Sequence, residues 1–248
     1  MLDDINEIEL NNGSKEQHPI HFRGRRHGRR LRPNLANLIN EDLPKVRINR
    51  QTPIENPLEL FPRGINDIWM EIGFGAGEHI AQQAEINPSV GFIGCEPFIN
   101  GVASLLRYVT NKKLPNVRIL PDDVRPFLSL LPDHSISRLF ILFPDPWRKK
   151  RHHSRRIIQR TTLNEFNRLL KVGGELRIAT DHPEYLRWIL IHLKNNKGFR
   201  WLARRPTDWR LRPEDWPETR YEKKALLAGR SPIFLQYKIQ IINIFKFI

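Results

Sequence analysis

The chain has 248 residues, and its 41 lysines and arginines against 27 aspartates and glutamates give a formal net charge of +14. Such a basic chain favours a polyanionic partner, for example nucleic acid. A membrane helix is not expected, because no segment approaches about 18 consecutive apolar residues, and the acidic start lacks the pattern of a signal peptide. One cysteine, Cys95, excludes an internal disulfide, and zinc-type spacing is absent. We therefore expect a cytoplasmic protein that binds neither a metal nor a membrane.

The first 62 residues show little regular patterning. Residues 1–18 are polar and acidic, and we expect them to form a disordered tail. Residues 19–62 are expected to form a basic arm and an N-terminal extension. The basic arm is His21–Arg32, which contains six arginines and two glycines, and Pro33–Pro62 is interrupted by prolines. The remaining residues, 63–248, are expected to form one domain.

From Ile65 onward, strand-like and helix-like segments alternate, which predicts βαβ units and a mostly parallel sheet. The expected strands are Asp67–Ile72, Val90–Glu96, Val117–Leu120, Ile136–Phe143 and Glu175–Ala179. The expected helices are Glu78–Ile86, Ile99–Val109, Val124–Leu131, Ile157–Leu170 and Pro183–Asn195. Gly173-Gly174 is expected to end the fourth helix, and the apolar segment Pro232–Ile241 is expected to add a closing strand at the sheet edge.

A glycine-rich turn follows the first expected strand and leads into a helix. Its glycines, Gly73, Gly75 and Gly77, permit the positive φ angles and the close approach that a ligand over a helix N-terminus requires. The next strand ends at Glu96, nineteen residues beyond Gly77. A carboxylate at that place can accept hydrogen bonds from both hydroxyls of a ribose. This layout indicates a cofactor that carries a nucleoside.

Two cofactor classes share this layout. The nicotinamide fingerprint needs glycine at the first, third and sixth places, but the sixth place here is Glu78. Phosphates also disfavour the nearby Glu71, whereas a cationic sulfonium with an amino-acid end tolerates it. The spacing therefore favours S-adenosylmethionine over a dinucleotide. A further acid, Asp123, follows the third strand, either as a cofactor ligand or as the N-cap of the helix that begins at Val124.

The most distinctive segment follows the fourth expected strand. Asp145 lies between two prolines and is followed by Trp147 and by the basic block, Arg148–Arg156. Ligands of open α/β sheets bind outside the carboxyl ends of the strands. An acid held there beside a polycation predicts chemistry on a nucleic acid, although most charge runs are only solvated loops. Trp147 is expected either to stack on an RNA base or to pack beneath the basic block.

These segments resemble the bacterial tRNA (guanine-N7)-methyltransferases. The matching residues are Glu71–Gly77, Phe92–Glu96, Phe143–Trp147, Lys149, Arg151-His152, Arg155, Arg156, Thr180-Asp181, Thr219–Glu222 and, in the basic arm, Phe22–Arg29. The box from Pro144 to Trp147 is the specific part of this resemblance, whereas the glycine turn is shared with most adenosylmethionine enzymes. Leu226–Gln236 follows the family pattern only loosely.

The resemblance implies a fold, an activity and a set of site residues. The fold is a single Rossmann-like class I methyltransferase domain of the α/β class, with a mostly parallel seven-stranded sheet and helices on both faces. The activity is methyl transfer from S-adenosyl-L-methionine to N7 of the variable-loop guanosine, guanine 46, of tRNA. The implied cofactor residues are Glu71, Gly73, Gly75, Gly77, Glu96, Asp123 and Asp145.

The resemblance also implies two groups of residues that contact the tRNA. The implied substrate-binding residues are Lys149, Asp181, Thr219, Arg220, Tyr221 and Glu222. The implied RNA-contacting residues are Arg151, His152, His153, Ser154, Arg155 and Arg156. Without the resemblance, the spacing of Thr219 and Glu222 indicates only a capping box at a helix start.

The residue types suit this reaction. N7 of guanine carries an in-plane lone pair and no proton, so the enzyme needs to align the reactants and control charge rather than remove a proton. A carboxylate beside the base can accept from its N1–H and N2–H groups and stabilise the ring as it becomes cationic. Asp145 or Asp181 could do this, and we favour Asp145 as the catalytic residue.

Three other functions are alternatives. One is a methyltransferase that acts on another RNA or on DNA. A second is an RNA-binding protein that keeps the fold without catalysis, although Asp145 and the glycine turn are both present. The third is a nicotinamide-dependent enzyme, which the glycine spacing disfavours. We expect a monomer that binds tRNA and needs no obligate protein partner.

Overall fold

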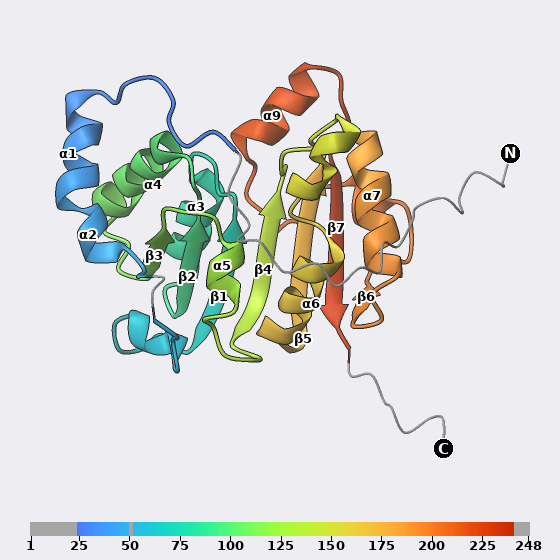
Figure 1. Ribbon diagram of the computed structural model, residues 1–248, viewed down its shortest axis with the longest axis horizontal. Coiled ribbons are helices and arrows are strands. Elements are labelled where there is room, and N and C mark those ends of the chain that lie inside the picture. Colours follow the sequence, from blue (N-terminus) through green and yellow to red (C-terminus); the bar gives the residue numbers. More distant parts are fainter. Residues whose placement is uncertain (1–23, 50–51, 241–248) are drawn as a thin grey trace, which may run out of the picture.

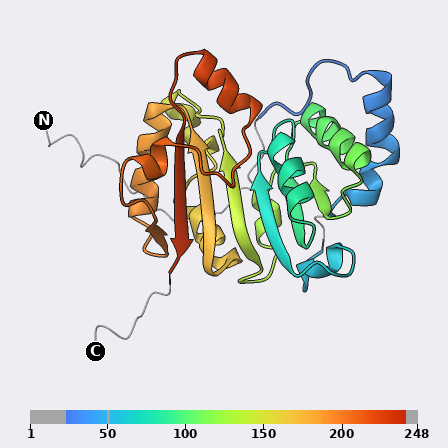
Figure 2. The ribbon, with the colours of Figure 1, turned by 180° about the vertical axis from the view of Figure 1, so that it is seen from behind.

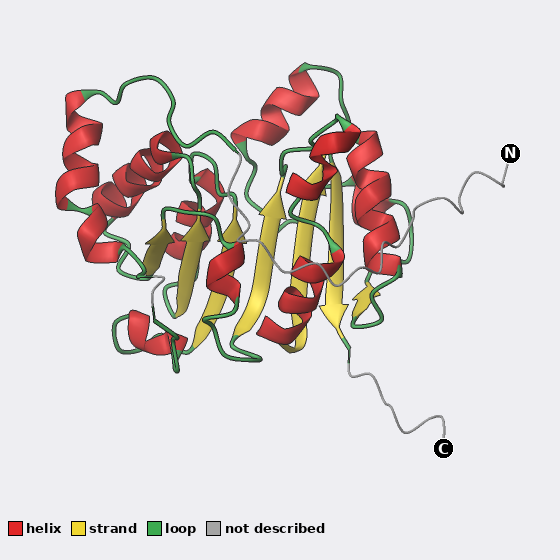
Figure 3. Cartoon of the chain, viewed as in Figure 1, coloured by secondary structure: helices red, strands yellow, loops and turns green. Residues whose placement is uncertain are grey.

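The computed structural model describes residues 24–49 and 52–240 of the chain. The expected disordered tail, residues 1–18, lies outside the described residues, as do the first residues of the basic arm and residues 241–248. The described residues form a seven-stranded sheet with the strand order β3-β2-β1-β4-β5-β7-β6. Helices cover both faces of this sheet (Figures 1 and 3). The expected α/β fold, with a mostly parallel seven-stranded sheet, is therefore confirmed.

The sheet is parallel at its centre and antiparallel at one side. Its strands are β1 (Asp67–Ile72), β2 (Val90–Cys95), β3 (Val117–Leu120), β4 (Ile136–Leu142), β5 (Leu170–Thr180), β6 (Phe199–Trp201) and β7 (Ile233–Ile239). Strands β1 to β5 pair in parallel, whereas β7 is antiparallel to both β5 and β6. β1 has β2 on one side and β4 on the other, so the order of the strands reverses here. In open α/β sheets, ligands bind at such a switch point, outside the carboxyl ends of the strands. We call this side of the sheet the carboxyl edge.

The described residues also form α-helices and two 3-10 helices. The α-helices are α1 (Pro33–Glu41), α2 (Leu43–Val46), α3 (Glu78–Ile86), α4 (Ile99–Lys112), α5 (Arg125–Leu128), α6 (Arg160–Leu169), α7 (Pro183–Lys194), α8 (Thr207–Arg210) and α9 (Arg220–Leu227). Two 3-10 helices, η2 (Pro57–Leu60) and η3 (Lys150–Arg155), complete the set. None of the helices in the described part of the chain is long and apolar enough to cross a membrane.

The hydrophobic core has one layer on each face of the sheet. On one face, Leu105 and Leu106 of α4 pack with Ile80 of α3 against the sheet, and Figure 2 shows α3 in front of the strands on this side. On the other face, side chains of α5, α6 and α7 such as Phe166 form the larger layer. All six residues of β2 are buried, as expected for a parallel strand that is covered on both faces.

The strongly patterned segments agree with the sequence. Strands Asp67–Ile72 and Val117–Leu120 and helix Glu78–Ile86 have the expected bounds. Strands β2 and β4 each end one residue earlier than expected, so Glu96 and Phe143 are the first residues beyond them. Helix α4 is longer than expected, and α5 is shorter.

Two expectations about the C-terminal half are wrong. Gly173-Gly174 does not end a helix, because α6 ends at Leu169 and both glycines lie within β5, where pairing with β4 shifts register. Gly173 has a φ of 76°, which lets the chain turn inside this strand. The closing strand β7 is also not at the sheet edge, because the three-residue β6 pairs with its free side.

The N-terminal extension is more regular than its proline content predicts. It contains α1, α2 and η2, and α1 lies beside α4 in both views (Figures 1 and 2). Ile48 is buried, and its backbone N–H donates to the carbonyl of Ile119 in β3 at 2.8 Å. The extension is therefore attached to the β3 side of the sheet.

Candidate active site

The glycine loop, Gly73–Gly77, connects β1 to α3 at the carboxyl edge. Its three glycines all have positive φ angles, of 75°, 58° and 84° in chain order. Helix α4 packs tightly against this loop: a Cβ added to Gly101 would lie 2.1 Å from the carbonyl oxygen of Gly75. The loop therefore needs glycine for its own backbone, and α4 needs glycine for its close approach to the loop.

Glu96 binds the glycine loop from the end of β2. Its carboxylate accepts from the backbone N–H of Gly75 and from that of Phe98, each at 2.9 Å. The side chain is buried. Burial disfavours the charged form and raises the pKa of Glu96 to about 7, and the nearby charges of Asp145 and Glu71 act in the same direction. Glu96 therefore titrates near neutral pH rather than well below it.

The carboxylate of Glu71 makes a buried contact with His79 that the sequence does not predict. Its Oε2 lies 2.7 Å from Nδ1 of His79, which comes from the first turn of α3. Both side chains are buried, and among the described residues Nε2 of His79 has no hydrogen-bond partner. The local sequence hints at this contact only through His79 itself, a polar residue on the buried face of α3. His79 therefore holds the Glu71 carboxylate in place beneath the glycine loop.

Asp123 contacts the start of the next helix, although the N-cap residue of α5 is Val124, and its role as a cofactor ligand stays a prediction. It lies at the carboxyl edge beyond β3 and is buried. One carboxylate oxygen accepts from the backbone N–H of Arg125, the first residue of α5, and the other pairs with the Arg125 guanidinium at 3.3 Å. The same guanidinium donates to the carbonyl of Arg155 at 2.7 Å. Arg125 thus connects the loop beyond β3 to the basic block.

Asp145 projects from the carboxyl edge beyond β4. The residues on either side of its proline pair, Phe143 and Trp147, have positive φ angles of 50° and 42°, which non-glycine residues rarely adopt. The Asp145 side chain is exposed and forms no hydrogen bond or ion pair within the described chain. The surrounding strand ends still desolvate the carboxyl group, which raises its pKa. A backbone held in a strained form around a partner-free carboxylate is typical of a functional site.

The basic block forms η3 and packs against Trp147. The guanidinium of Arg155 lies over the Trp147 ring at 5.0 Å from its centroid, and the His152 ring meets it edge-on at 6.0 Å. Trp147 is half-buried, so the expected packing beneath the basic block is present. Stacking of the same ring on an RNA base stays a prediction.

Arg156 does not lie where an RNA-contacting residue must lie, and the expectation for this residue is wrong. Its side chain is completely buried. The guanidinium donates to the carbonyl of Pro146 at 2.8 Å and pairs with Glu184 of α7 at 2.7 Å. It also lies over the ring of Trp188 at 4.7 Å from the centroid. Arg156 is therefore an internal anchor, whereas Lys149, Arg151 and Ser154 are exposed.

Helix α9 covers the glycine loop from above in Figure 1. Tyr221 lies against Gly75, because a Cβ added there would come within 2.9 Å of the tyrosine ring. Arg220 lies 3.9 Å from Glu78 at the start of α3. Thr219 is the N-cap of α9 and accepts from the backbone N–H of Glu222 at 3.1 Å. The capping interaction is therefore present, although the Glu222 carboxylate pairs with Arg212 at 3.0 Å.

Asp181 lies at the same edge, directly beyond β5. Its carboxylate accepts from the Arg230 guanidinium at 2.6 Å, across 49 residues of sequence. Arg230 follows α9, so this ion pair ties the segment that carries α9 to the end of β5. Nothing in the local sequence around Asp181 indicates this partner.

The acids around the glycine loop fit S-adenosylmethionine. Four carboxylates lie at the carboxyl edge, in Glu71, Glu96, Asp123 and Asp145. They suit a cofactor that has a sulfonium, an ammonium group and ribose hydroxyls, whereas they would repel a pyrophosphate. Within residues 24–49 and 52–240, no group of three or more metal-ligating side chains is close enough to hold a metal ion.

The chain is similar to known methyltransferases. A family model described as "Putative methyltransferase" matches residues 66–235. The chain is 48% identical over 221 residues to a tRNA (guanine-N(7)-)-methyltransferase of Rhodospirillum rubrum, covering 88% of this chain and 87% of that protein. It is 46% identical over 230 residues to the enzyme of the same name from Paramagnetospirillum magneticum, covering 92% and 96%.

A solved structure shows the same fold. The 16S rRNA methyltransferase KamB matches with a TM-score of 0.56 and 17% identity, over 77% of this chain and 96% of that one. At this identity the match indicates a shared fold alone. The sequence relatives define the family more narrowly, at 46–48% identity over most of both chains. The chain therefore belongs to the family of tRNA (guanine-N7)-methyltransferases.

Proposed function

We propose that this protein transfers the methyl group of S-adenosyl-L-methionine to N7 of guanosine 46, in the variable loop of tRNA. One observation carries the proposal. The glycine loop with its acids and the partner-free Asp145 lie at the same edge of the sheet as the exposed cations of the basic block. A methyl donor, a carboxylate for the base and cations for the RNA backbone are the parts this reaction needs.

The cofactor, when bound, supplies an electrophilic methyl group on its sulfonium. Glu96 would accept from the ribose hydroxyls, and it keeps oxygen lone pairs for them while bonding two backbone N–H groups. Glu71, held by His79, would face the cationic amino-acid end. Gly73, Gly75, Gly77 and Asp123 would complete the cofactor site.

Asp145 would hold the guanine. An ionised carboxylate accepts from the N1–H and N2–H groups, which orients N7 and stabilises the positive charge that the ring gains. Asp145 has both oxygens available for this, because it forms no hydrogen bond or ion pair with any described residue. No proton leaves N7 before attack, so the reaction needs no general base.

The tRNA would contact the surfaces that flank Asp145. Lys149, Arg151 and Arg155, with His152, His153 and Ser154, would bind it from the basic block, and Asp181 and Thr219–Glu222 would bind it from the opposite side. Arg156 would act from inside, by holding the basic block against α7. We propose that the protein works as a cytoplasmic monomer with no obligate protein partner.

The test is site-specific detection of the product. Purified protein is incubated with unmodified tRNA transcripts and methyl-labelled S-adenosylmethionine, and borohydride and aniline then cleave the RNA at N7-methylguanosine. We expect label in the RNA and one cleavage, at position 46. A transcript with adenosine at position 46 is the matched control and should remain intact. Methylation without cleavage in the variable loop would refute the stated specificity and would point to another nucleotide.

A further inference from the structure

A pocket rich in arginine lies on the β3 side of the carboxyl edge, apart from the basic block. We call it the arginine pocket. It has a volume of about 250 Å³ and is lined by Arg30, Leu31, Arg32, Asn34, Leu35, Asn100 and Arg107. Three of these seven residues are cationic and none is acidic. Arg30, Arg32 and Arg107 are exposed, and no described residue forms an ion pair with any of them.

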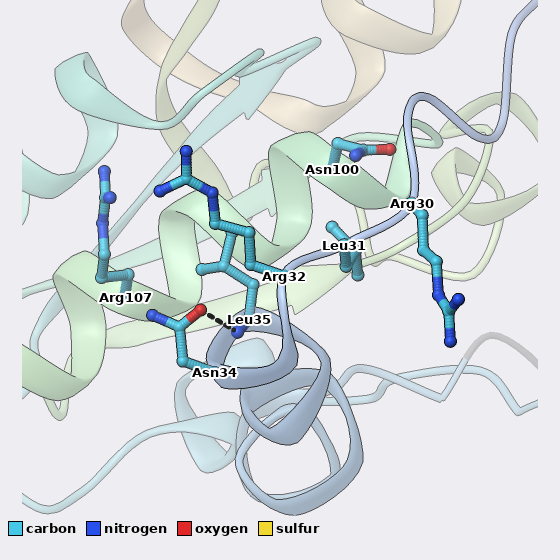
Figure 4. A pocket seen from close by; sticks show the side chains of 7 residues that line it. All are labelled: Arg30, Leu31, Arg32, Asn34, Leu35, Asn100 and Arg107. Carbon is cyan, nitrogen blue, oxygen red and sulfur yellow. Dashed lines mark hydrogen bonds between the residues drawn. The ribbon is translucent and has the colours of Figure 1, made fainter.

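The pocket combines two segments that are far apart in the sequence. Arg32 is the last residue of the basic arm, and Arg107 lies 75 residues later, on α4. Figure 4 shows their side chains extending in the same direction over the pocket, while Arg30 projects on the other side of the arm. Like charges that are brought together without an acid raise the energy of the protein unless an anion joins them.

The arm is attached to α4 by specific hydrogen bonds. The side chain of Asn100 accepts from the backbone N–H of Gly28 at 2.7 Å and donates to the carbonyl of Arg29 at 2.8 Å. Asn100 and Arg107 are seven residues apart, so they lie on the same face of α4, about 10 Å from one another. The arm therefore places Arg32 in the same pocket as Arg107 of α4.

The donors in the pocket suit phosphate. Guanidinium groups bind phosphate oxygens through paired N–H donors. The Oδ1 of Asn34 accepts from the backbone N–H of Leu35 at 3.0 Å (dashed in Figure 4), which leaves the side-chain amide of Asn34 as a further donor. The pocket thus offers several donors and little negative charge.

We propose that the arginine pocket binds a backbone phosphate of the RNA substrate, as a second anchor separate from the basic block. This inference rests on the proposed function. The pocket lies beside β3 and the basic block lies beside α7, so the two flank the glycine loop and Asp145 from opposite sides (Figure 1). A polyanion held at both places spans the site, and the reacting base is positioned between two fixed points.

The experiment compares the double variant R32Q/R107Q with R63Q. Arg63 is exposed, lies just before β1 at the opposite end of the sheet, and forms no ion pair with a described residue. Binding of tRNA is measured in the presence of S-adenosylhomocysteine over a range of salt concentrations. We expect R32Q/R107Q to bind about tenfold more weakly than wild type. The slope of log K against log[salt] should also fall by about 0.7–0.9 for each phosphate that the variant no longer neutralises. R63Q should match wild type in both quantities.

Two further measurements separate binding from structure. The double variant should melt no lower than the wild type and should keep the wild-type affinity for S-adenosylhomocysteine, and its kcat at saturating tRNA should be unchanged while KM rises. A loss of cofactor affinity or a lower melting temperature would assign the arginines a structural role and overturn the proposal. Equal tRNA affinity and salt slope in R32Q/R107Q and R63Q would also overturn it, even if inorganic phosphate still stabilised the wild type.

The binding measurement does not depend on turnover, so the two proposals can fail separately. A wild-type protein that binds tRNA through the pocket but methylates no guanosine would refute the proposed function alone. A protein that methylates position 46 and binds tRNA equally well without Arg32 and Arg107 would refute only the second anchor.

Discussion

The carboxylates around the glycine loop differ in the groups of the protein that pair with them. Glu71 is paired with a histidine, Glu96 with two backbone amides and Asp123 with an arginine. Asp145 alone among these four has no partner within the described residues. The first three are therefore built into the site before any ligand binds, whereas the carboxylate of Asp145 is available to a substrate.

The first prediction concerns Asp145. Asp145→Asn keeps the size of the side chain but replaces one acceptor with an N–H donor, which opposes the guanine N1–H group. We expect kcat to fall by about a hundredfold or more, while the dissociation constant of S-adenosylhomocysteine changes by less than about threefold. Single-turnover methylation and calorimetry measure these two quantities. Asp133→Asn, at an exposed aspartate that pairs with Arg168, is the control. Unchanged turnover in Asp145→Asn would remove this residue from catalysis.

The second prediction follows from the raised pKa of Glu96, about 7. A ribose donates two hydroxyls to the ionised carboxylate, so cofactor binding favours ionisation and releases a proton. Affinity should therefore rise with pH while Glu96 still titrates. Between pH 5.5 and pH 7.0 we expect S-adenosylhomocysteine to bind about fifteenfold more tightly, because the ionised fraction of Glu96 grows by about that factor.

The control for this pH dependence is Glu96→Gln, which cannot ionise. It should bind the cofactor more weakly and should show no rise in affinity over the same pH range. Calorimetry in buffers of different ionisation enthalpy should detect proton release for the wild type only. A wild-type affinity that stays constant from pH 5.5 to pH 7.0 would contradict the assignment of Glu96 to the ribose.

At the scale of elements, the basic block carries exposed cations and is fixed to the rest of the protein by one buried residue, Arg156. Its short helix, η3, has no buried residue. The next residue, Arg156, has no exposed surface and bonds to the backbone beside Asp145 and to α7. The element is thereby held against α7 by Arg156 and against Trp147 by His152 and Arg155. Its position relative to Asp145 depends on these contacts rather than on the helix itself.

The third prediction separates two arginines in this element. Arg156→Ala removes a buried guanidinium and its hydrogen bonds, so we expect the free energy of unfolding to fall by about 3 kcal/mol and the melting temperature by roughly 10 °C. Arg151→Ala removes an exposed charge and should change stability by less than about 0.5 kcal/mol. Both variants should bind tRNA more weakly, Arg151→Ala through weaker phosphate attraction and Arg156→Ala through displacement of the basic block.

Thermal unfolding and tRNA titration distinguish these causes. Arg156→Lys is the matched variant: it keeps the charge but not the planar fork, so it should recover little of the stability. If Arg156→Ala melted with the wild type and lost only tRNA affinity, the anchor role would be wrong and Arg156 would have to reach the RNA in another conformation.

At the scale of the whole molecule, cationic surfaces lie on both sides of an acidic centre. The arm and α4 form one side next to β3, and η3 forms the other next to α7 (Figure 1). The acids lie between them, at the ends of β1, β2, β3 and β4. This arrangement suits the proposed function, in which the negative charge would receive a cationic cofactor and the positive charge would receive the RNA backbone.

The sequence by itself determined the centre of the fold and the candidate cofactor site. Strand β1 and the glycine loop can be recognised together, because a short strand that runs directly into a turn with positive φ needs glycine there. Asp145 can be recognised from its place between two prolines after an apolar strand. Glu96 follows from its place at the end of the next strand. These features depend on neighbouring residues, so a short window of sequence contains enough information to predict them.

Only the tertiary structure decided which charges face solvent and which distant segments meet. Arg151 and Arg156 are the same residue type in one basic run, yet one is exposed and the other is fully buried under α7. Strand β7 pairs on both sides because the three-residue β6, too short to show a pattern, lies beyond it. Asp181 meets Arg230 across 49 residues, and Arg32 lines one pocket with Arg107. Such contacts depend on how the whole chain closes upon itself, and local periodicity contains no information about that closure.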